Sequence, residues 1–120
     1  MAWGSKTNAT QLTSITTEQF FSTLVTLNPG ETAHCEVEAN PPATPTDNLI
    51  VAIYGTLDAS SESWDETPYM EFVIDKAIVP NKRAFKVSGL YKFRVGVRRS
   101  GTTDTYTSAD FSYRLDGVNL

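Results

Sequence analysis

The stretch LYKFRVGVR, residues 90–98, decides the fold. Two sets of side chains alternate along it, one apolar and one basic: Tyr91, Phe93, Val95 and Val97 against Lys92, Arg94 and Arg98. Successive side chains of a β-strand point to opposite faces of a sheet, whereas helical side chains return to one face every third or fourth residue. The pattern therefore predicts a strand with one face in a core and the other in water.

The rest of the chain carries similar patterns. Further strands are expected at six segments: 11–17, 20–27, 33–39, 49–54, 69–74 and 105–115. The segment 49–54, LIVAIY, is a continuous apolar run, which is typical of a central strand covered on both faces. Residues 75–86 fit either a strand end or a single helical turn, which Pro80 would stop.

Turn residues such as Asn28-Pro29-Gly30 and Ser100-Gly101 separate these segments. No segment carries the 10–15-residue helical pattern that a parallel sheet needs for its crossovers. We therefore expect an all-β fold, an antiparallel immunoglobulin-like or jelly-roll-like β-sandwich of about seven to eight strands. At 120 residues the chain is the size of one ordinary domain, so we divide it into an N-terminal arm (1–9) and a single sandwich domain (10–120).

Composition excludes several classes of protein. The chain has 10 Lys and Arg against 14 Asp and Glu, a net charge of −4, so neither nucleic acid nor a membrane is an expected partner. It also lacks a bilayer-length apolar run and the pattern of a signal peptide, so we expect no secretion. Cys35 and His34 are its only cysteine and histidine, and on a strand they would point to opposite faces. We expect no enzyme activity, no catalytic residues, no cofactor and no metal site.

One acidic loop invites several interpretations. Residues 57–69 combine four acids with two large aromatic residues: Asp58, Glu62, Asp65 and Glu66 with Trp64 and Tyr69. The acids would suit Ca²⁺ or glycoside hydrolysis, but the spacing of a calcium loop is missing and nothing indicates the separation that two catalytic carboxylates require. Trp64 and Tyr69 would suit a sugar-stacking platform. Alternatively, Trp64 caps one end of the core and the acids are solvated.

Two further groups are candidates for partner contacts. The arm contains Trp3, a large apolar anchor of the kind that is enriched at interfaces, flanked by Met1 and Lys6. Arg98 and Arg99 lie at a strand end, where they would contact an acidic partner or remain solvated. Together with the two aromatic residues of the loop they form the predicted partner-binding set: Met1, Trp3, Lys6, Trp64, Tyr69, Arg98 and Arg99.

Three stretches are similar to small virion proteins of tailed bacteriophages: IVAIYGTLD at 50–58, WDETP at 64–68 and GLYKFRVGVRRSG at 89–101. This resemblance implies a non-enzymatic capsid decoration (cement) protein on the virion surface, assembled in the bacterial cytoplasm. The implied partners are the major capsid protein and neighbouring copies of the chain itself. No family motif carries functional residues over. The alternatives are a tail or neck β-sandwich, or a carbohydrate-binding module that takes a host-surface glycan.

Overall fold

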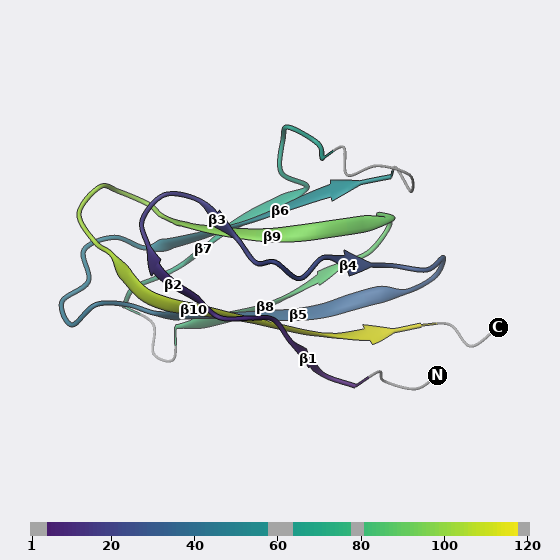
Figure 1. Ribbon diagram of the computed structural model, residues 1–120, viewed down its shortest axis with the longest axis horizontal. Coiled ribbons are helices and arrows are strands. Elements are labelled where there is room, and N and C mark those ends of the chain that lie inside the picture. The colour runs from purple at the N-terminus through teal and green to yellow at the C-terminus, as the bar shows by residue number, and fades with distance from the viewer. Residues whose placement is uncertain (1–4, 58–63, 78–80, 118–120) are drawn as a thin grey trace.

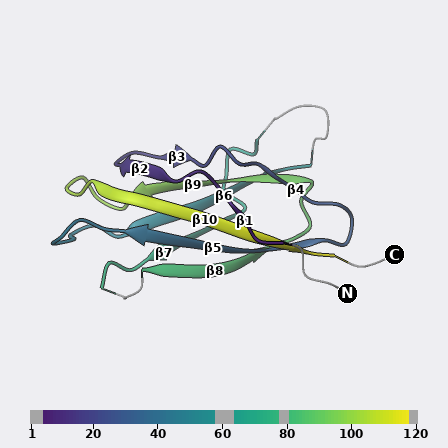
Figure 2. The ribbon, with the colours of Figure 1, turned by 60° about the horizontal axis from the view of Figure 1, so that its bottom comes forward.

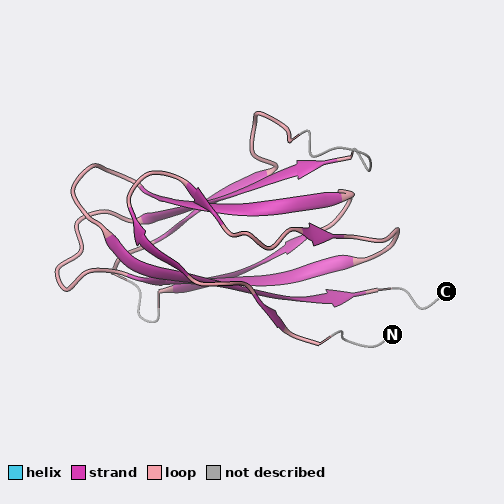
Figure 3. Cartoon of the chain, viewed as in Figure 1, coloured by secondary structure: helices cyan, strands magenta, loops and turns pink. Residues whose placement is uncertain are grey.

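The computed structural model describes residues 5–57, 64–77 and 81–117. Within these residues every regular element is a β-strand, and the strands form two antiparallel sheets packed face to face (Figures 1 and 3). The predicted all-β sandwich is therefore confirmed. No helix in the described ranges has the length or hydropathy to cross a membrane.

Each sheet has five strands. Sheet A contains β1 (Thr7–Asn8), β2 (Leu12–Ile15), β5 (Thr32–Asn40), β8 (Lys82–Val87) and β10 (Tyr106–Asp116). Sheet B contains β3 (Gln19–Phe20), β4 (Val25–Thr26), β6 (Leu49–Thr56), β7 (Met70–Ile74) and β9 (Lys92–Arg99).

The strand order identifies the sandwich as a jelly roll. β1 and β2 pair with successive parts of β10, and β3 and β4 with successive parts of β9, so each pair is one interrupted strand. We count β1 with β2 as strand 1, β3 with β4 as strand 2, and β5 to β10 as strands 3 to 8. The strand order is then 1-8-3-6 in sheet A and 2-7-4-5 in sheet B. This nesting of two Greek keys defines a jelly roll, and it decides between the two sandwich types that the sequence left open.

The core lies between the sheets and is built by the alternating positions. Buried and half-buried residues alternate along the whole of β5, and Cys35 is on the buried side, as its place in the sequence predicts. β6 is buried almost throughout, as expected of a central strand. The largest fully buried side chains come from both sheets: Tyr106, Phe21, Phe93 and Phe111. Along one side of the sandwich, Phe72 of β7 packs on Phe85 of β8 with ring centroids 5.0 Å apart, where the two strands run side by side (Figure 2).

The edges of the sheets differ from the sequence prediction. The expected strand at 20–27 contains only β4 and the end of β3, because this segment forms an interrupted edge. The segment 75–86, for which the sequence left two possibilities, contains most of β8. The first three residues of β8 are all exposed, so its sequence lacks the alternation that would identify a strand. β8 ends at Val87 and β9 begins at Lys92, with a turn between them in which Gly89 has φ 79°.

The N-terminal segment joins sheet A before it crosses to sheet B. Thr7 and Asn8 pair with Tyr113 and Ser112 of β10, so the last part of the proposed arm lies at a sheet edge. At the crossing, Ser14 has φ 52°, in the left-handed region that non-glycine residues seldom occupy. Gln19 donates a side-chain hydrogen bond to the Ser14 carbonyl (3.3 Å), which supports this corner.

Candidate functional site

The outer face of sheet B carries an organised layer of side chains that faces away from the core. Arg94, Gly96 and Arg98 of β9 lie on this face, because Phe93, Val95 and Val97 fill the inward positions. The register places Tyr54 beside Arg94 and Ala52 beside Gly96. Ala52 is 0% exposed although it points away from the core, so side chains of the outer layer cover it.

Arg94 is surrounded by aromatic rings. Its guanidinium carbon lies 3.8 Å from the centroid of Phe20, 5.0 Å from that of Trp64 and 5.8 Å from that of Tyr54. Phe20 and Tyr54 also meet edge to face, with centroids 5.6 Å apart. We call these four residues the arginine–aromatic cluster. Cation–π contacts of this kind contribute roughly 0.5–2 kcal/mol each, depending on how far they are desolvated.

Gly96 makes room for the cluster. Phe20 and Gly96 are direct cross-strand partners, and the phenyl ring lies over the glycine. A Cβ atom at position 96 would lie 2.8 Å from Cε1 of Phe20, which is closer than carbon atoms pack. The glycine therefore lets the ring lie flat on the sheet, where it reaches Arg94.

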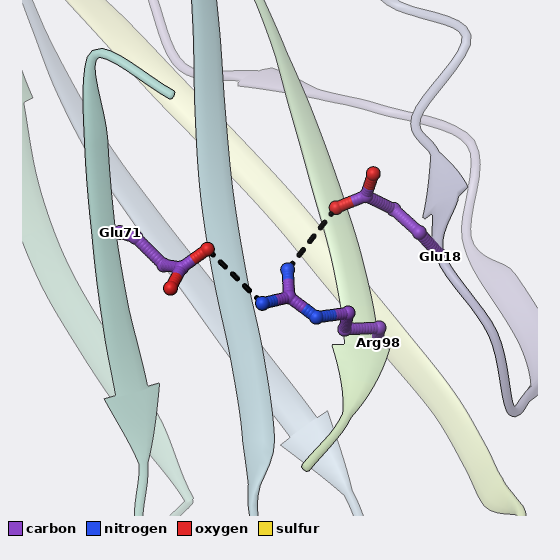
Figure 4. A network of polar contacts seen from close by, with 3 residues as sticks. All are labelled: Glu18, Glu71 and Arg98. Atoms are coloured by element: carbon purple, nitrogen blue, oxygen red, sulfur yellow. Dashed lines mark hydrogen bonds and ion pairs between the residues drawn. The ribbon is translucent and has the colours of Figure 1, made fainter. Parts of the chain in front are cut away.

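Arg98 is the last of the three outward-facing residues of β9 and makes two ion pairs. One of its terminal nitrogens lies 3.3 Å from Glu18 and the other 3.1 Å from Glu71, so it bridges the segment before β3 to β7 (Figure 4). All three side chains are partly exposed, and such pairs are worth about 0–1 kcal/mol each. Burial, followed by the charge of Glu18, raises the pKa of Tyr54 beside this network. Tyr54 is thus held in its neutral form.

A second polar arrangement, the Asp47–Asp104 latch, joins two loops at one end of the sandwich. The Asp104 carboxylate accepts from the backbone N–H groups of Thr46 (2.6 Å) and Asp47 (2.8 Å), and from the Thr46 hydroxyl (3.1 Å). In return, the Asp47 carboxylate accepts from the N–H groups of Thr103 (3.0 Å) and Asp104 (2.9 Å). Tyr106 donates its hydroxyl to the Asp47 carbonyl at 2.6 Å.

Two residues of the latch, Asp104 and Tyr106, have shifted pKa values. The backbone hydrogen bond from Asp47 is the main cause that lowers the pKa of Asp104, and the bonds from Thr46 add to it. Burial raises the pKa of Tyr106 to about 12. Because every donor and acceptor here serves to join the 41–48 and 100–105 loops, we interpret the latch as structural.

The predicted partner-binding residues do not gather at one place. Met1 and Trp3 lie outside the described residues. Lys6 lies over sheet A, where it lines two small depressions of 180 and 260 Å³. Trp64 stands on the outer face of sheet B against Arg94, instead of capping the core. Tyr69 is 46% exposed, and its hydroxyl donates to the Ser88 carbonyl (3.1 Å).

The two arginines at the strand end, Arg98 and Arg99, make polar contacts within the fold. Arg98 makes the double ion pair described above, and Arg99 donates to the Asp104 carbonyl at 2.8 Å. Both are also partly exposed, so these contacts do not decide between the two interpretations. Their predicted role in binding a partner remains a prediction.

The acidic loop is only partly described. Asp58 and Glu62 lie outside the described residues, while Asp65 and Glu66 are exposed. In the part of the chain that the structure describes, no group of three or more His, Cys, Asp or Glu side chains is placed to hold a metal ion. His34 contacts Asp116 at 3.2 Å and is half-buried, whereas Cys35 is buried on the other side of β5.

Sequence reasoning missed three members of the outer layer. Phe20 and Tyr54 stand in apolar segments, where the sequence predicts strand residues without a role of their own, and the alternation predicts Arg94 only as part of a wet face. The period-two pattern did place Arg94 outward, and Gly96 inside a strand was a signal of close packing. Neither feature could show that the distant Phe20 would cover both.

Comparisons with known proteins add a likeness in fold. No family model matches the sequence, and no curated protein matches it. A solved structure of Bacillus endospore appendages, a family of disulfide-linked pili, superposes with a TM-score of 0.57 at 12% sequence identity. The match covers 98% of this chain and 88% of that chain. At this identity the likeness shows a shared fold alone.

Proposed function

We propose that the chain is a non-enzymatic structural subunit that binds other proteins of a large assembly. More specifically, we propose that the assembly is a bacteriophage virion, in which the chain decorates the capsid and contacts the major capsid protein and neighbouring copies of itself. The observation that carries the proposal is the outer layer of sheet B. It orders aromatic and arginine side chains on a face that the fold does not need to cover.

Residue types support this reading. Trp, Tyr and Arg are the residues that most often dominate binding energy at protein interfaces. Here they are held in place before any partner arrives, which lowers the entropy cost of association. Val73 of β7 (44% exposed) pairs with Ile50, the partner of Arg98, and so adds an exposed apolar side chain to this face. An interface on this face would therefore combine fixed anchors with apolar surface.

Fold and sequence likeness agree with an architectural role. Jelly rolls are common in viral capsid proteins, and the resemblance to phage virion proteins rests largely on residues 89–101, which include all of β9. The related fold of the endospore appendage subunit offers a second candidate, a subunit of a filament. That appendage is described as disulfide-linked, whereas the single cysteine of this chain, Cys35, is buried.

The test is whether the chain is part of purified particles. Virions of the phage that encodes it, purified on a density gradient, should contain the chain in a fixed ratio to the major capsid protein. Particles assembled without it should bind the recombinant chain saturably. Absence of the chain from such particles would contradict the virion role, and a fixed ratio to a filament protein instead would favour the second candidate.

Two variants would locate the contact. Deletion of residues 1–6 removes most of the proposed arm and leaves β1 in place, so a loss of particle binding would assign a contact to the arm. Trp64→Ala removes one ring of the outer layer, and Glu38→Lys on the outer face of sheet A is its matched control. We expect Trp64→Ala to weaken binding and Glu38→Lys to leave it unchanged.

The carbohydrate alternative has less support. The Arg94 guanidinium lies over one face of the Trp64 ring, so only the opposite face could stack on a sugar. Silence on an array of bacterial surface glycans would agree with this interpretation. Saturable binding that Trp64→Ala abolishes would instead support a glycan partner.

A further inference from the structure

Arg94 has no polar partner in the described part of the chain. Its contacts are the three rings of the arginine–aromatic cluster, and no ion pair or hydrogen bond joins it to a carboxylate. Its Nε is buried without a hydrogen-bond partner, whereas its two Nη groups are not buried. A buried unpaired donor is uncommon and costs about 1–3 kcal/mol. It shows that the described residues do not complete the hydrogen bonding of this guanidinium.

Arg98 provides the comparison within the same strand. It stands two positions further along the same face of β9, and its terminal nitrogens already meet Glu18 and Glu71. The chain thus satisfies one arginine of the row with two carboxylates and leaves the other against aromatic rings. Among the described residues, a carboxylate is what the environment of Arg94 lacks.

We propose that Arg94 is a binding site for a carboxylate side chain of a protein partner, held by the two Nη groups. Because Phe20 lies only 3.8 Å from the guanidinium carbon, that ring covers one face of the guanidinium and fixes its plane. The donors that remain lie at the edge of that plane, where a carboxylate can accept two parallel hydrogen bonds. The inference rests on the proposed function, and names the chemistry of its partner.

A protein carboxylate fits better than an acidic sugar. An acidic sugar would use an open aromatic face beside its carboxylate, whereas here each ring directs one face to the guanidinium. An acidic side chain needs only the exposed edge. The surrounding aromatic rings also limit water around the ion pair, which strengthens it relative to the exposed pairs of Arg98.

Nuclear magnetic resonance on the full chain tests the site directly. A capped hexaglutamate peptide is titrated while the Nε–H signal of Arg94 and the indole N–H signal of Trp64 are followed. We expect both signals to shift saturably, and a hexaglutamine peptide to leave them in place. No saturable shift, or equal shifts with hexaglutamine, would overturn the proposal.

Substitutions show whether binding needs the paired donors of the guanidinium or only its positive charge. Arg94→Lys keeps the charge but loses the paired donors, and should weaken peptide binding about tenfold. Arg83→Lys on β8 of sheet A is the matched control, and should change binding less than about twofold because that arginine lies outside the outer layer of sheet B. Unchanged affinity in Arg94→Lys, or trigalacturonate binding more tightly than the peptide, would contradict a protein carboxylate.

Failure of this inference and failure of the proposed function are distinguishable. The wild-type titration needs no variant to fold and no particle to be present. If the chain is found in virions but ignores hexaglutamate, the structural role stands and the carboxylate site is wrong. If it binds hexaglutamate at Arg94 but is absent from particles, the site stands and the virion role is wrong.

Discussion

Replacement of Tyr106 by phenylalanine isolates one hydrogen bond of the Asp47–Asp104 latch. The tyrosine is 1% exposed, and its hydroxyl lies 2.6 Å from the carbonyl oxygen of Asp47, which is itself buried. Phenylalanine keeps the ring and its packing and removes only the oxygen. The variant should therefore fold, with the Asp47 carbonyl left without this donor.

The expected cost is about 1–2 kcal/mol, because the lost bond is buried and its acceptor stays behind. Domains of this size unfold with an entropy of about 0.25 kcal/mol per kelvin near 60 °C, so the melting temperature should fall by about 4–8 °C. Thermal and urea unfolding followed by circular dichroism would measure both quantities.

Alkaline pH supplies a second measurement. The pKa of Tyr106 is raised by burial to about 12 in the fold, above its ordinary value near 10. Its neutral form therefore stabilises the fold fully below pH 10, and that stabilisation is lost as pH rises through 12. The difference in unfolding free energy between wild type and Tyr106→Phe should shrink across this range. Cys35, whose pKa burial also raises to about 12, is present in both proteins and cancels.

Tyr113→Phe is the matched control on the same strand. Tyr113 is half-buried, and its hydroxyl makes no hydrogen bond to another described residue. Its replacement should change stability by less than about 0.5 kcal/mol. The reasoning is refuted if Tyr106→Phe is as stable as wild type, or if both substitutions cost the same.

Three further results are expected. Cys35, buried and with its pKa raised to about 12, should react with Ellman's reagent at pH 8 at least about a hundredfold more slowly in the fold than in urea, and rapid labelling would contradict its burial. Stability should decrease as pH falls below about 4, because the bond from Asp47 lowers the pKa of Asp104, and urea titrations of Asp104→Asn should show a weaker acid dependence. Gly96→Ala should cost about 1–3 kcal/mol and move the Arg94 Nε–H resonance, since the new methyl group displaces Phe20; an unchanged resonance would argue against the close contact.

The central strands could be predicted from the sequence because each has either one face in the core and one in water, or both faces buried. β5 and β9 show period-two alternation, and β6 is a continuous apolar run, so their existence and inward residues followed directly. Edge strands such as β8 lacked this signal because their exposed positions place no restriction on polarity. Strand order was also beyond reach, since the pairing of β5 with β10 depends on contacts between distant segments.

The outer layer of sheet B shows why a functional face is harder to predict than a core. Alternation places Arg94 and Arg98 on the same face and makes them equivalent. Register then separates them, because Arg98 meets two acids and Arg94 meets Phe20, Tyr54 and Trp64. The charge of Arg98 is paired within the fold and contributes to it. The charge of Arg94 is held in place by aromatic rings and is not paired by any described residue, so it is available to another molecule. The difference between these two arginines, four residues apart on one face of β9, is therefore the physical basis for assigning Arg94 to a partner.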